Sequence, residues 1–142
     1  MDNLENVKKF KANETPSPAP HFIAKVSTAN TEMTAVLNQS LAHAIDLRSR
    51  TKQAYWSAKG GSFYALHKMF DDFSDSLDSV ADEMATRVMA LGGVPVWTQA
   101  AIEKTSKLPA YPAGAVQALD HLDALIASYE AASRHLPPAM AK

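Results

Sequence analysis

One apolar stripe constrains the fold more than any other feature of this 142-residue sequence. Over the range 62–91, apolar side chains recur every three or four residues, a near-heptad period sustained for about eight turns. This period excludes a strand and predicts one long helix that packs along other helices at a shallow angle. Ser62 is expected to cap its start through the side-chain hydroxyl, and Gly92-Gly93 followed by Pro95 to end it. The stripe consists of Phe63, Leu66, Phe70, Phe73, Leu77, Val80, Met84, Val88 and Leu91.

Two further long helices are expected on either side of this one. The first covers about 28–58 and ends at Gly60-Gly61, because residues without a Cβ are poor helix formers. The last begins near Pro112 and ends at Pro137-Pro138, and a short helix over 98–104 lies in the connection between. Three apolar stripes predict an all-α fold, and the Gly-Gly turn makes the first two helices antiparallel neighbours. The apolar positions are Leu37, Leu41, Ala44 and Ile45 in the first helix, and Val116, Leu119, Leu122, Ile126, Tyr129 and Leu136 in the last.

The composition favours a soluble protein with a single domain. Lys and Arg total 14 against 15 for Asp and Glu, so the formal net charge of -1 creates no broad basic surface for nucleic acid. The absence of Cys excludes disulfides and thiolate metal sites. No apolar run approaches the ~20 residues that span a bilayer, and no secretory signal opens the chain, so we expect a cytoplasmic protein without membrane contact. The Pro-rich range 1–27 is expected to be a flexible tail ahead of one domain over 28–142.

Three polar side chains of the long helix have a spacing that suits metal binding. His67 and Asp71 are four residues apart, so they lie one turn apart on the same face. Asp82 returns to nearly that face but lies roughly 16 Å further along the axis, too far for one ion with bonds of ~2 Å. Two copies of the helix, antiparallel about a twofold axis near 76–77, would bring His67 and Asp71 of one copy to Asp82 of the other. One imidazole with carboxylates suits iron.

A solvated polar face is the alternative interpretation of the same residues, because further acidic side chains lie on this helix. The sequence contains no Gly-rich phosphate loop, nucleophile elbow or zinc-protease motif, and no Glu-x-x-His pair of a di-iron carboxylate bundle. Spacing alone leaves both interpretations open. The additional acids are Asp72, Asp75, Asp78 and Glu83.

A longer pattern resembles a known family. The stretch from Leu37 to Phe73, LNQSLAHAIDLRSRTKQAYWSAKGGSFYALHKMFDDF, is similar to the signature of Dps, the mini-ferritin family of DNA-binding proteins from starved cells. The TKQAxW, ALHxM and LGG motifs carry the resemblance. It continues through Asp82, Arg87, Tyr111-Pro112, Val116-Gln117 and the DHL at 120–122, and covers roughly 28–136.

The resemblance implies a ferritin-like helical bundle, assembled through twofold interfaces into a dodecameric hollow shell. Members oxidise Fe(II), preferentially with hydrogen peroxide, and store ferric iron in the cavity, which limits oxidative damage to DNA and cell; many also coat DNA. The implied activity is therefore ferroxidase, with iron as the metal and His67, Asp71 and Asp82 at matching positions. A cytoplasmic, nucleoid-associated location is implied as well.

The sequence departs from the family pattern at three points. Tyr55 stands before Trp56 where the family has His, and Thr86 stands where it has Glu, so two good ligands are lost. The three remaining residues suit one iron better than two. No fourth long helix follows Pro137-Pro138, so we expect an incomplete bundle whose apolar seams face water over several hundred Å².

Three functions remain open. The first is an iron-storing, peroxide-consuming mini-ferritin. The second is a degenerate or truncated paralogue with weak or no ferroxidase activity that acts as a structural or DNA-associated shell subunit. The third is a non-enzymatic partner in the shells of an intact paralogue. DNA is a weak candidate partner, since the range 1–27 carries four Lys against three acidic residues.

The other aromatic and imidazole side chains are assigned structural or incidental roles. Trp56 and Trp97 are expected to be packing anchors. His43, His121 and His135 are expected to be solvent-exposed helix residues, and His21 lies in the tail, where it could bind metal adventitiously.

Overall fold

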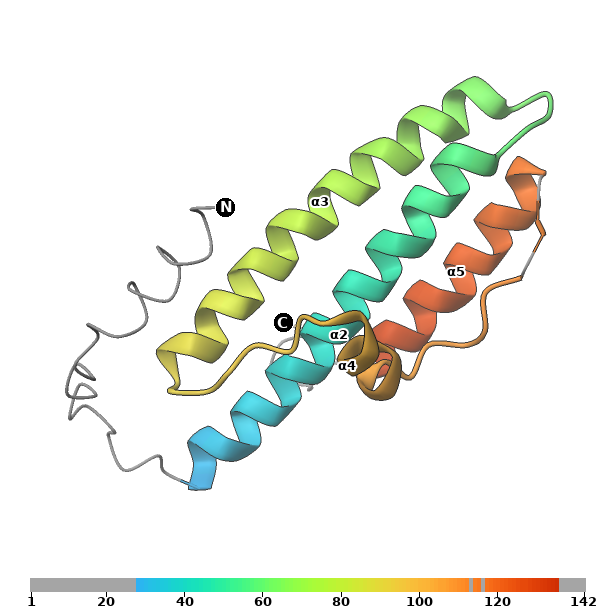
Figure 1. Cartoon of the computed structure of the whole chain (residues 1–142). Helices are drawn as coiled ribbons and strands as arrows, with labels where there is room; N and C mark the ends of the chain where they lie inside the picture. Colours follow the sequence, from blue (N-terminus) through green and yellow to red (C-terminus); the bar gives the residue numbers. More distant parts are fainter. Residues whose placement is uncertain (1–27, 113, 116, 136–142) are drawn as a thin grey trace, which may run out of the picture.

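The structure, a computed structural model, describes residues 28–112, 114–115 and 117–135. In these ranges the helices are α2 (Thr28–Ser57), α3 (Phe63–Ala90), α4 (Gln99–Thr105) and α5 (Ala118–Arg134), and no strand is formed. α2 and α3 run antiparallel side by side, and α5 also packs along α2 (Figure 1). The predicted all-α fold and the short helix in the connection are confirmed. The expected tail over 1–27, His21, Leu136 and Pro137-Pro138 lie outside the described residues.

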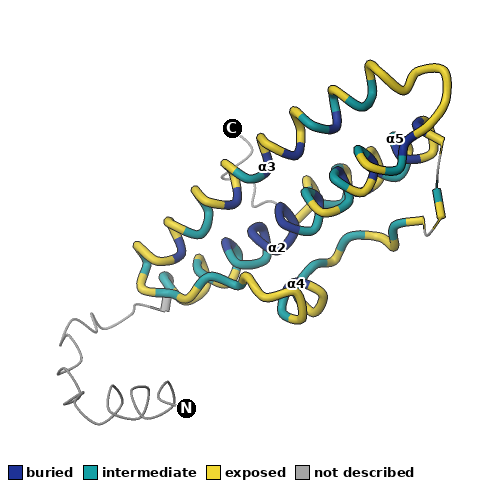
Figure 2. Tube along the Cα trace, turned by 45° about the horizontal axis from the view of Figure 1, so that its top comes forward, coloured by how far each residue is buried: buried dark blue, intermediate teal, exposed yellow. Residues whose placement is uncertain are grey.

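α2 is the central element, because α3, α4 and α5 all pack against it. Its apolar positions Leu37, Leu41, Ala44 and Ile45 are buried, as their helical spacing predicts. Figure 2 shows buried positions following the middle of α2, whereas exposed positions are frequent along α3. The core therefore forms around α2, and the outer faces of its neighbours meet solvent.

The two Gly-Gly turns end α2 and α3 as predicted, but the predicted cap of α3 is wrong. Gly60 has a φ of 113° in the turn after α2. At the end of α3, Gly92 has a φ of 80°, its N–H bonds the Met89 carbonyl and the Gly93 N–H bonds the Val88 carbonyl, the arrangement of a Schellman motif. Ser62 has a φ of -94° and a ψ of 10° rather than extended backbone, so its hydroxyl makes no capping bond.

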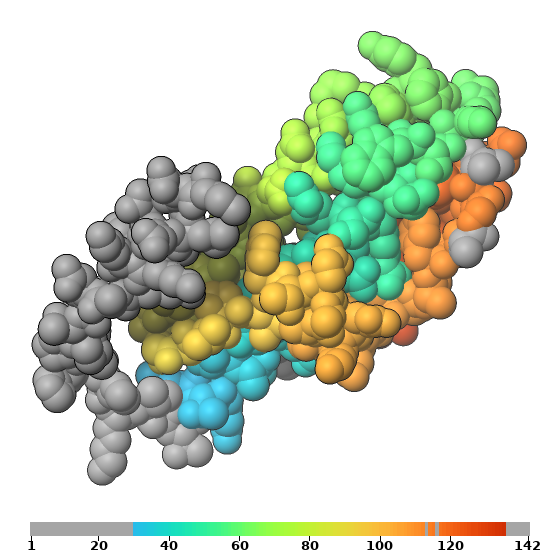
Figure 3. All heavy atoms as spheres, viewed as in Figure 1, coloured from blue at the N-terminus to red at the C-terminus, as the bar shows by residue number. Residues whose placement is uncertain are grey.

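The connection after α3 is fixed to α2 by side chains of α2. The amide of Asn38 donates to the Val94 carbonyl at 3.0 Å, and its oxygen accepts from the Val96 N–H at 2.9 Å. Ile102 of α4 is buried against α2. In the space-filling view the connection lies over part of α2 (Figure 3). These contacts hold a segment without long helix close to the core.

The last helix begins at Ala118, six residues after the predicted start at Pro112. The chain first turns at Gly114, whose φ is 84°, and then reaches the turn between α2 and α3. There the Ala118 N–H donates to the Lys59 carbonyl at 2.9 Å, next to an isolated parallel bridge between Lys59 and Gln117. Residues before Ala118 are therefore used for a long-range contact that local periodicity does not reveal.

The predicted apolar stripe of α5 is confirmed only in part, because Leu122 and Tyr129 pack against the core whereas Leu119 and Ile126 do not. The buried residues of α5 are Ala118, His121, Leu125 and Ser128, while Leu119 and Ile126 of the predicted apolar stripe are exposed. The buried side of α5 faces α2, where Arg50 donates a 3.0 Å hydrogen bond to Ser128, and Ile126 and Tyr129 line a groove together with Phe73 of α3. Val116, also assigned to this stripe, is not described.

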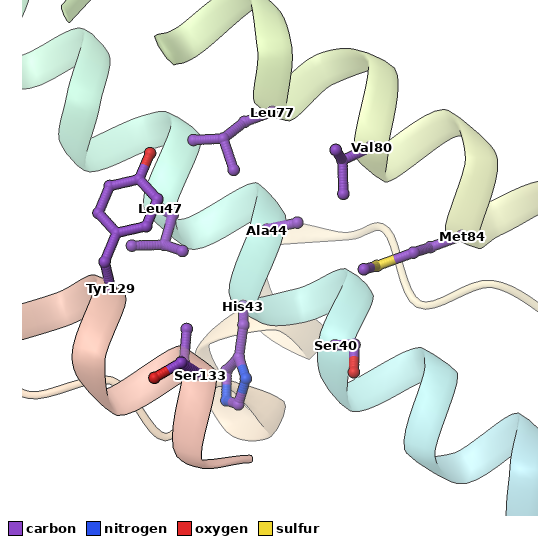
Figure 4. Close-up of a pocket in the computed structure, with 10 residues that line it drawn as sticks. Ser40, His43, Ala44, Leu47, Leu77, Val80, Met84, Tyr129 and Ser133 are labelled. Atoms are coloured by element: carbon purple, nitrogen blue, oxygen red, sulfur yellow. The ribbon is translucent and has the colours of Figure 1, made fainter. Parts of the chain in front are cut away.

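An apolar groove consequently remains between α3 and α5, with α2 as its floor. One cavity in it, of about 190 Å³, is lined by side chains from all three helices, which point into the space between them (Figure 4). Phe73 and Val80 of α3 stay exposed beside it. Of the long predicted stripe, Phe70, Leu77 and Val88 are buried, and Leu66 and Met84 are partly buried against the core. The cavity lining includes Ala44, Leu47, Leu77, Val80, Met84 and Tyr129.

The prediction that both Trp residues are packing anchors is wrong. Trp56 is 71% exposed, because the buried side of the last turns of α2 is formed by Ala54 and Ala58 and Trp56 lies across the helix from them. Trp97 is 57% exposed in the connection before α4. Neither ring contributes to the core of the described chain.

Candidate metal site on α3

His67 is oriented by the last turn of α2. Its Nδ1 lies 2.9 Å from the backbone oxygen of Tyr55. Tyr55 is in the last turn of α2, where backbone carbonyls have no N–H partner within the helix. A carbonyl only accepts, so Nδ1–H is the donor and the lone pair stays on Nε2. The imidazole also stacks on the Tyr55 ring, with ring centroids 3.9 Å apart, and its centroid lies 4.8 Å from that of the Phe63 ring. Metal-binding His residues are commonly fixed in this way, by a bond from their second nitrogen.

Asp71 lies one turn further along α3 and is paired with a cation from α2. Its Oδ1 is 2.8 Å from Lys52 Nζ, and Lys52 Nζ also lies 4.7 Å from the centre of the Tyr55 ring. The hydrogen bond with Lys52 lowers the pKa of Asp71, and the nearby His67 acts in the same direction. The same bond raises the pKa of Lys52. Asp71 is thus an ionised carboxylate that already attracts a positive charge.

Asp82 is exposed near the other end of α3. Its backbone carbonyl accepts a hydrogen bond of 2.9 Å from Thr86 Oγ1, so the Thr86 hydroxyl is turned back to its own helix. Among the described residues, no three His, Asp or Glu side chains are close enough to share a metal ion. One copy of the chain therefore brings His67 and Asp71 together but leaves Asp82 apart.

Lys52 is the residue of this site that the sequence analysis did not identify. The signal available was its spacing of three residues from Tyr55, which puts both on one side of α2. Its pairing with Asp71, 19 residues away, depends on how α2 and α3 are aligned and could not be read from local spacing.

The expectation of solvent-exposed histidines is wrong for two of three. His43 is 3% exposed, and its Nε2 accepts a 3.2 Å hydrogen bond from the Lys107 N–H. His121 is 1% exposed on the face of α5 that meets α2. Burial lowers the pKa of both imidazoles. Only His135 is exposed as expected, with its ring 5.2 Å from that of His43.

Known proteins share both the sequence pattern and this arrangement of helices. The ferritin-like domain family matches residues 34–141. A protein of Agrobacterium fabrum called "DNA protection during starvation protein" is 45% identical over 103 residues, 72% of this chain and 64% of that protein. The structure of DpsA14 from Streptomyces coelicolor is 33% identical, with a TM-score of 0.72, covering 75% of this chain and 64% of that one. A Dps protein from Vibrio cholerae O1, described as a member of "a broad superfamily of ferritin-like diiron-carboxylate proteins", is 20% identical, with a TM-score of 0.70, over 78% of this chain and 69% of that one.

The arrangement of the helices is thus that of a ferritin-like fold. The chain belongs to the ferritin-like domain family and, within it, to the Dps proteins. It spans less than two thirds of the length of the Agrobacterium protein. Among the described helices, none combines the length and apolar character needed to cross a lipid bilayer.

Proposed function

We propose that this chain is a mini-ferritin subunit that binds Fe(II) between two copies and oxidises it with hydrogen peroxide in the cytoplasm. His67 and Asp71 of one copy and Asp82 of the other are the proposed ligands. The observation that supports this most is the bond from His67 Nδ1–H to the Tyr55 carbonyl, which leaves Nε2 free for a metal. The diiron-carboxylate description of the Vibrio relative and the resemblance to Dps point to iron as the metal.

The donor set suits iron that is bound as a substrate. One neutral imidazole and two carboxylates favour a divalent first-row metal and neutralise its charge. The Lys52 ammonium group must leave Asp71 before a metal can bind there. The positive charge of the metal ion then takes the place of the ammonium charge beside the carboxylate. Since Tyr55 and Thr86 supply no good ligand, each site holds one Fe(II) and delivers one electron at a time. We expect a slower, weaker ferroxidase than a site with five such ligands.

Anaerobic Fe(II) titration followed by peroxide addition tests the activity. Binding should saturate, and ferric absorbance should rise after peroxide is added. Asp71→Asn should weaken binding strongly, whereas Asp72→Asn is the matched control, because the neighbouring Asp72 is also paired with a Lys, Lys68. No Fe(II) binding by the unmodified protein, or equal losses in the two variants, would contradict the proposal.

Mixing two defective variants tests the position of the site between copies. A His67→Ala/Asp71→Asn chain and an Asp82→Asn chain each lack part of every site. If the sites lie across a twofold axis, half of the randomly mixed pairs contain one complete site, which restores about a quarter of the original sites. An Asp75→Asn chain in place of Asp82→Asn is the control for general acidity. A mixture that binds no better than its components would reject the twofold arrangement.

The name of the Agrobacterium relative states that it protects DNA. The proposed iron chemistry accounts for such protection without any contact between protein and DNA. Consuming Fe(II) and peroxide at the protein lowers the amounts of both that can react next to DNA. The near-neutral formal charge provides no broad phosphate-binding surface. We therefore expect DNA to migrate unretarded in a gel shift at low salt, and retarded DNA would add a binding function to the proposal.

A further inference from the structure

Tyr111 and His121 form a hydrogen-bonded phenol–imidazole pair away from the candidate metal ligands. The Tyr111 hydroxyl oxygen lies 2.6 Å from His121 Nδ1, and the two rings stack with centroids 5.9 Å apart. Tyr111 is half-buried in the connection before α5, and His121 is almost completely buried on α5. His121 Nε2 is buried without a hydrogen-bond partner of ordinary geometry. The proposed iron chemistry uses neither residue.

The surroundings determine where the shared proton lies. Burial raises the pKa of Tyr111 to about 12 and lowers the pKa of His121, so both groups are neutral near pH 7. The phenol O–H therefore donates to Nδ1, and the imidazole keeps its own proton on Nε2. If the imidazole takes up a second proton, the Ala115 carbonyl and the Asp120 carboxylate stabilise it. The guanidinium of Arg50 lies 6.0 Å from the centre of the Tyr111 ring, on the α2 side of the pair.

Of the four tyrosines, Tyr111 alone has a base on its hydroxyl group. Tyr64 is 84% exposed. The half-buried Tyr129 interacts with the hydroxyl of Thr51, which is no base. Tyr55 meets His67 face to face, but the His67 Nδ1–H bonds the backbone carbonyl of Tyr55 rather than its phenol. This matters because a phenol that loses an electron becomes a strong acid, and its oxidation is easy only if a base accepts the proton.

Tyr111 also lies close to the last turns of α2, which contact the candidate ligands His67 and Asp71 of α3. Tyr55 and Tyr111 both pack against one buried cluster, so the Tyr111–His121 pair and the stacked rings of Tyr55 and His67 border the same part of the core. The cluster consists of Ala54, Ala58, Phe70, Ala118 and Leu125.

We propose that Tyr111 and His121 act as an internal electron and proton source that quenches one-electron oxidants. The proposal rests on the proposed function for its oxidant. One Fe(II) reduces peroxide to hydroxide and hydroxyl radical and becomes Fe(III). Tyr111 then gives one electron to the hydroxyl radical, which becomes a second hydroxide. The phenolic O–H bond breaks, the proton moves to His121 Nδ1, and a neutral tyrosyl radical faces an imidazolium. A site that delivers single electrons needs such a partner more than a site with two irons does.

Freeze-quench electron paramagnetic resonance tests the pair with two oxidants. The first is Fe(II) with peroxide, and the second is a photogenerated ruthenium(III) tris-bipyridine complex, which needs no iron site. With both, the unmodified protein should give a neutral tyrosyl signal. Tyr111→Phe should lose most of that signal, whereas the matched control Tyr129→Phe should keep it. Spin trapping and peptide mapping of the unmodified protein should place the adduct at Tyr111, which keeps the test valid if a variant does not fold.

His121→Gln tests whether the imidazole accepts the proton or only positions the phenol. Gln can accept the hydrogen bond through its amide oxygen but cannot take the proton. Radical formation should slow by on the order of tenfold or more, as positioned bases are worth ~10²–10⁴ elsewhere, and its solvent isotope effect should change. An unchanged rate, or adducts at tyrosines other than Tyr111 with both oxidants, would overturn the proposal. A Tyr111 radical with the photo-oxidant but no ferric signal would reject the iron function and leave the pair standing.

Discussion

Lys52 Nζ lies 2.8 Å from Asp71 Oδ1, so an ammonium group is paired with a carboxylate that we propose as an iron ligand. The two side chains are 25% and 41% exposed, which makes this a partly solvated pair. Such solvated ion pairs contribute little to stability and are weaker than a metal–carboxylate bond. The described conformation is therefore compatible with a site that is closed by its own lysine until a metal replaces it.

Removing this lysine should strengthen metal binding. Lys52→Met keeps most of the aliphatic stem and removes the competing charge, so the Fe(II) affinity should rise by about two- to fivefold, the equivalent of an exposed ion pair. Lys68→Met is the matched control, because Lys68 pairs with Asp72 and should leave the affinity unchanged. Anaerobic calorimetry measures both. A lower affinity in Lys52→Met would mean that Lys52 positions Asp71 rather than competing for it.

Restoring the lost ligands should strengthen it further. Tyr55→His places an imidazole beside the His67 ring, and Thr86→Glu places a carboxylate one turn after Asp82. Each added ligand should raise the Fe(II) affinity by on the order of tenfold, and the double variant should bind a second iron per site. Iron content per chain and the initial rate of ferric absorbance are the measurements. An Asp82→Asn background should abolish the gain from Thr86→Glu if both side chains serve one site.

Stability should fall as the pH is lowered through the range of histidine titration. Burial lowers the folded-state pKa of His43 and of His121 below the ordinary value of 6.5. Above that value both imidazoles are neutral in the folded and in the unfolded chain, so they do not make the free energy of unfolding depend on pH. Below it the unfolded chain binds protons first, so the free energy of unfolding drops until the folded-state pKa values are passed. Urea unfolding between about pH 7.5 and pH 5.5 should show the loss. The His43→Gln/His121→Gln variant should flatten it, and an unchanged slope would contradict the assignment.

Gly93 should not tolerate a side chain. A Cβ there would lie 2.3 Å from Thr34 Cγ2 and 3.1 Å from Val88 Cγ1. Gly93→Ala should therefore lower the free energy of unfolding by ~1–3 kcal/mol. Thr34→Ala removes the closest atom and a buried hydroxyl that has no partner, so the double variant should recover most of the loss. Gly61→Ala is the control: nothing lies within 4 Å, and stability should be unchanged or ~0.4–1 kcal/mol higher.

Local spacing was sufficient to predict the helices and the shared face of His67 and Asp71. A period of 3.6 residues and the Gly-Gly breaks depend on neighbours in the chain, so α2 and α3 match their predicted ranges closely. The twofold placement of Asp82 stays a prediction, because the described chain contains no second copy.

Contacts between distant residues account for the errors. α5 begins late because Ala118 bonds Lys59, which is 59 residues earlier in the chain. His121 is buried because it lies on the side of α5 that faces α2. Lys52 reaches Asp71 because of the register between two helices. Each depends on tertiary packing, which periodicity does not specify.

The central position of α2 also affects how the chain can be made. α2 and α3 leave the ribosome first among the described helices, and they share the most extensive packing of any pair. Their hairpin joins neighbouring segments, so it can close early and quickly. The connection and α5 can then pack on a surface that has already formed. The Ala118 N–H donates to the Lys59 carbonyl in the turn between α2 and α3 and so holds the start of α5 there. Each described helix that follows the hairpin can therefore pack on segments that precede it in the chain.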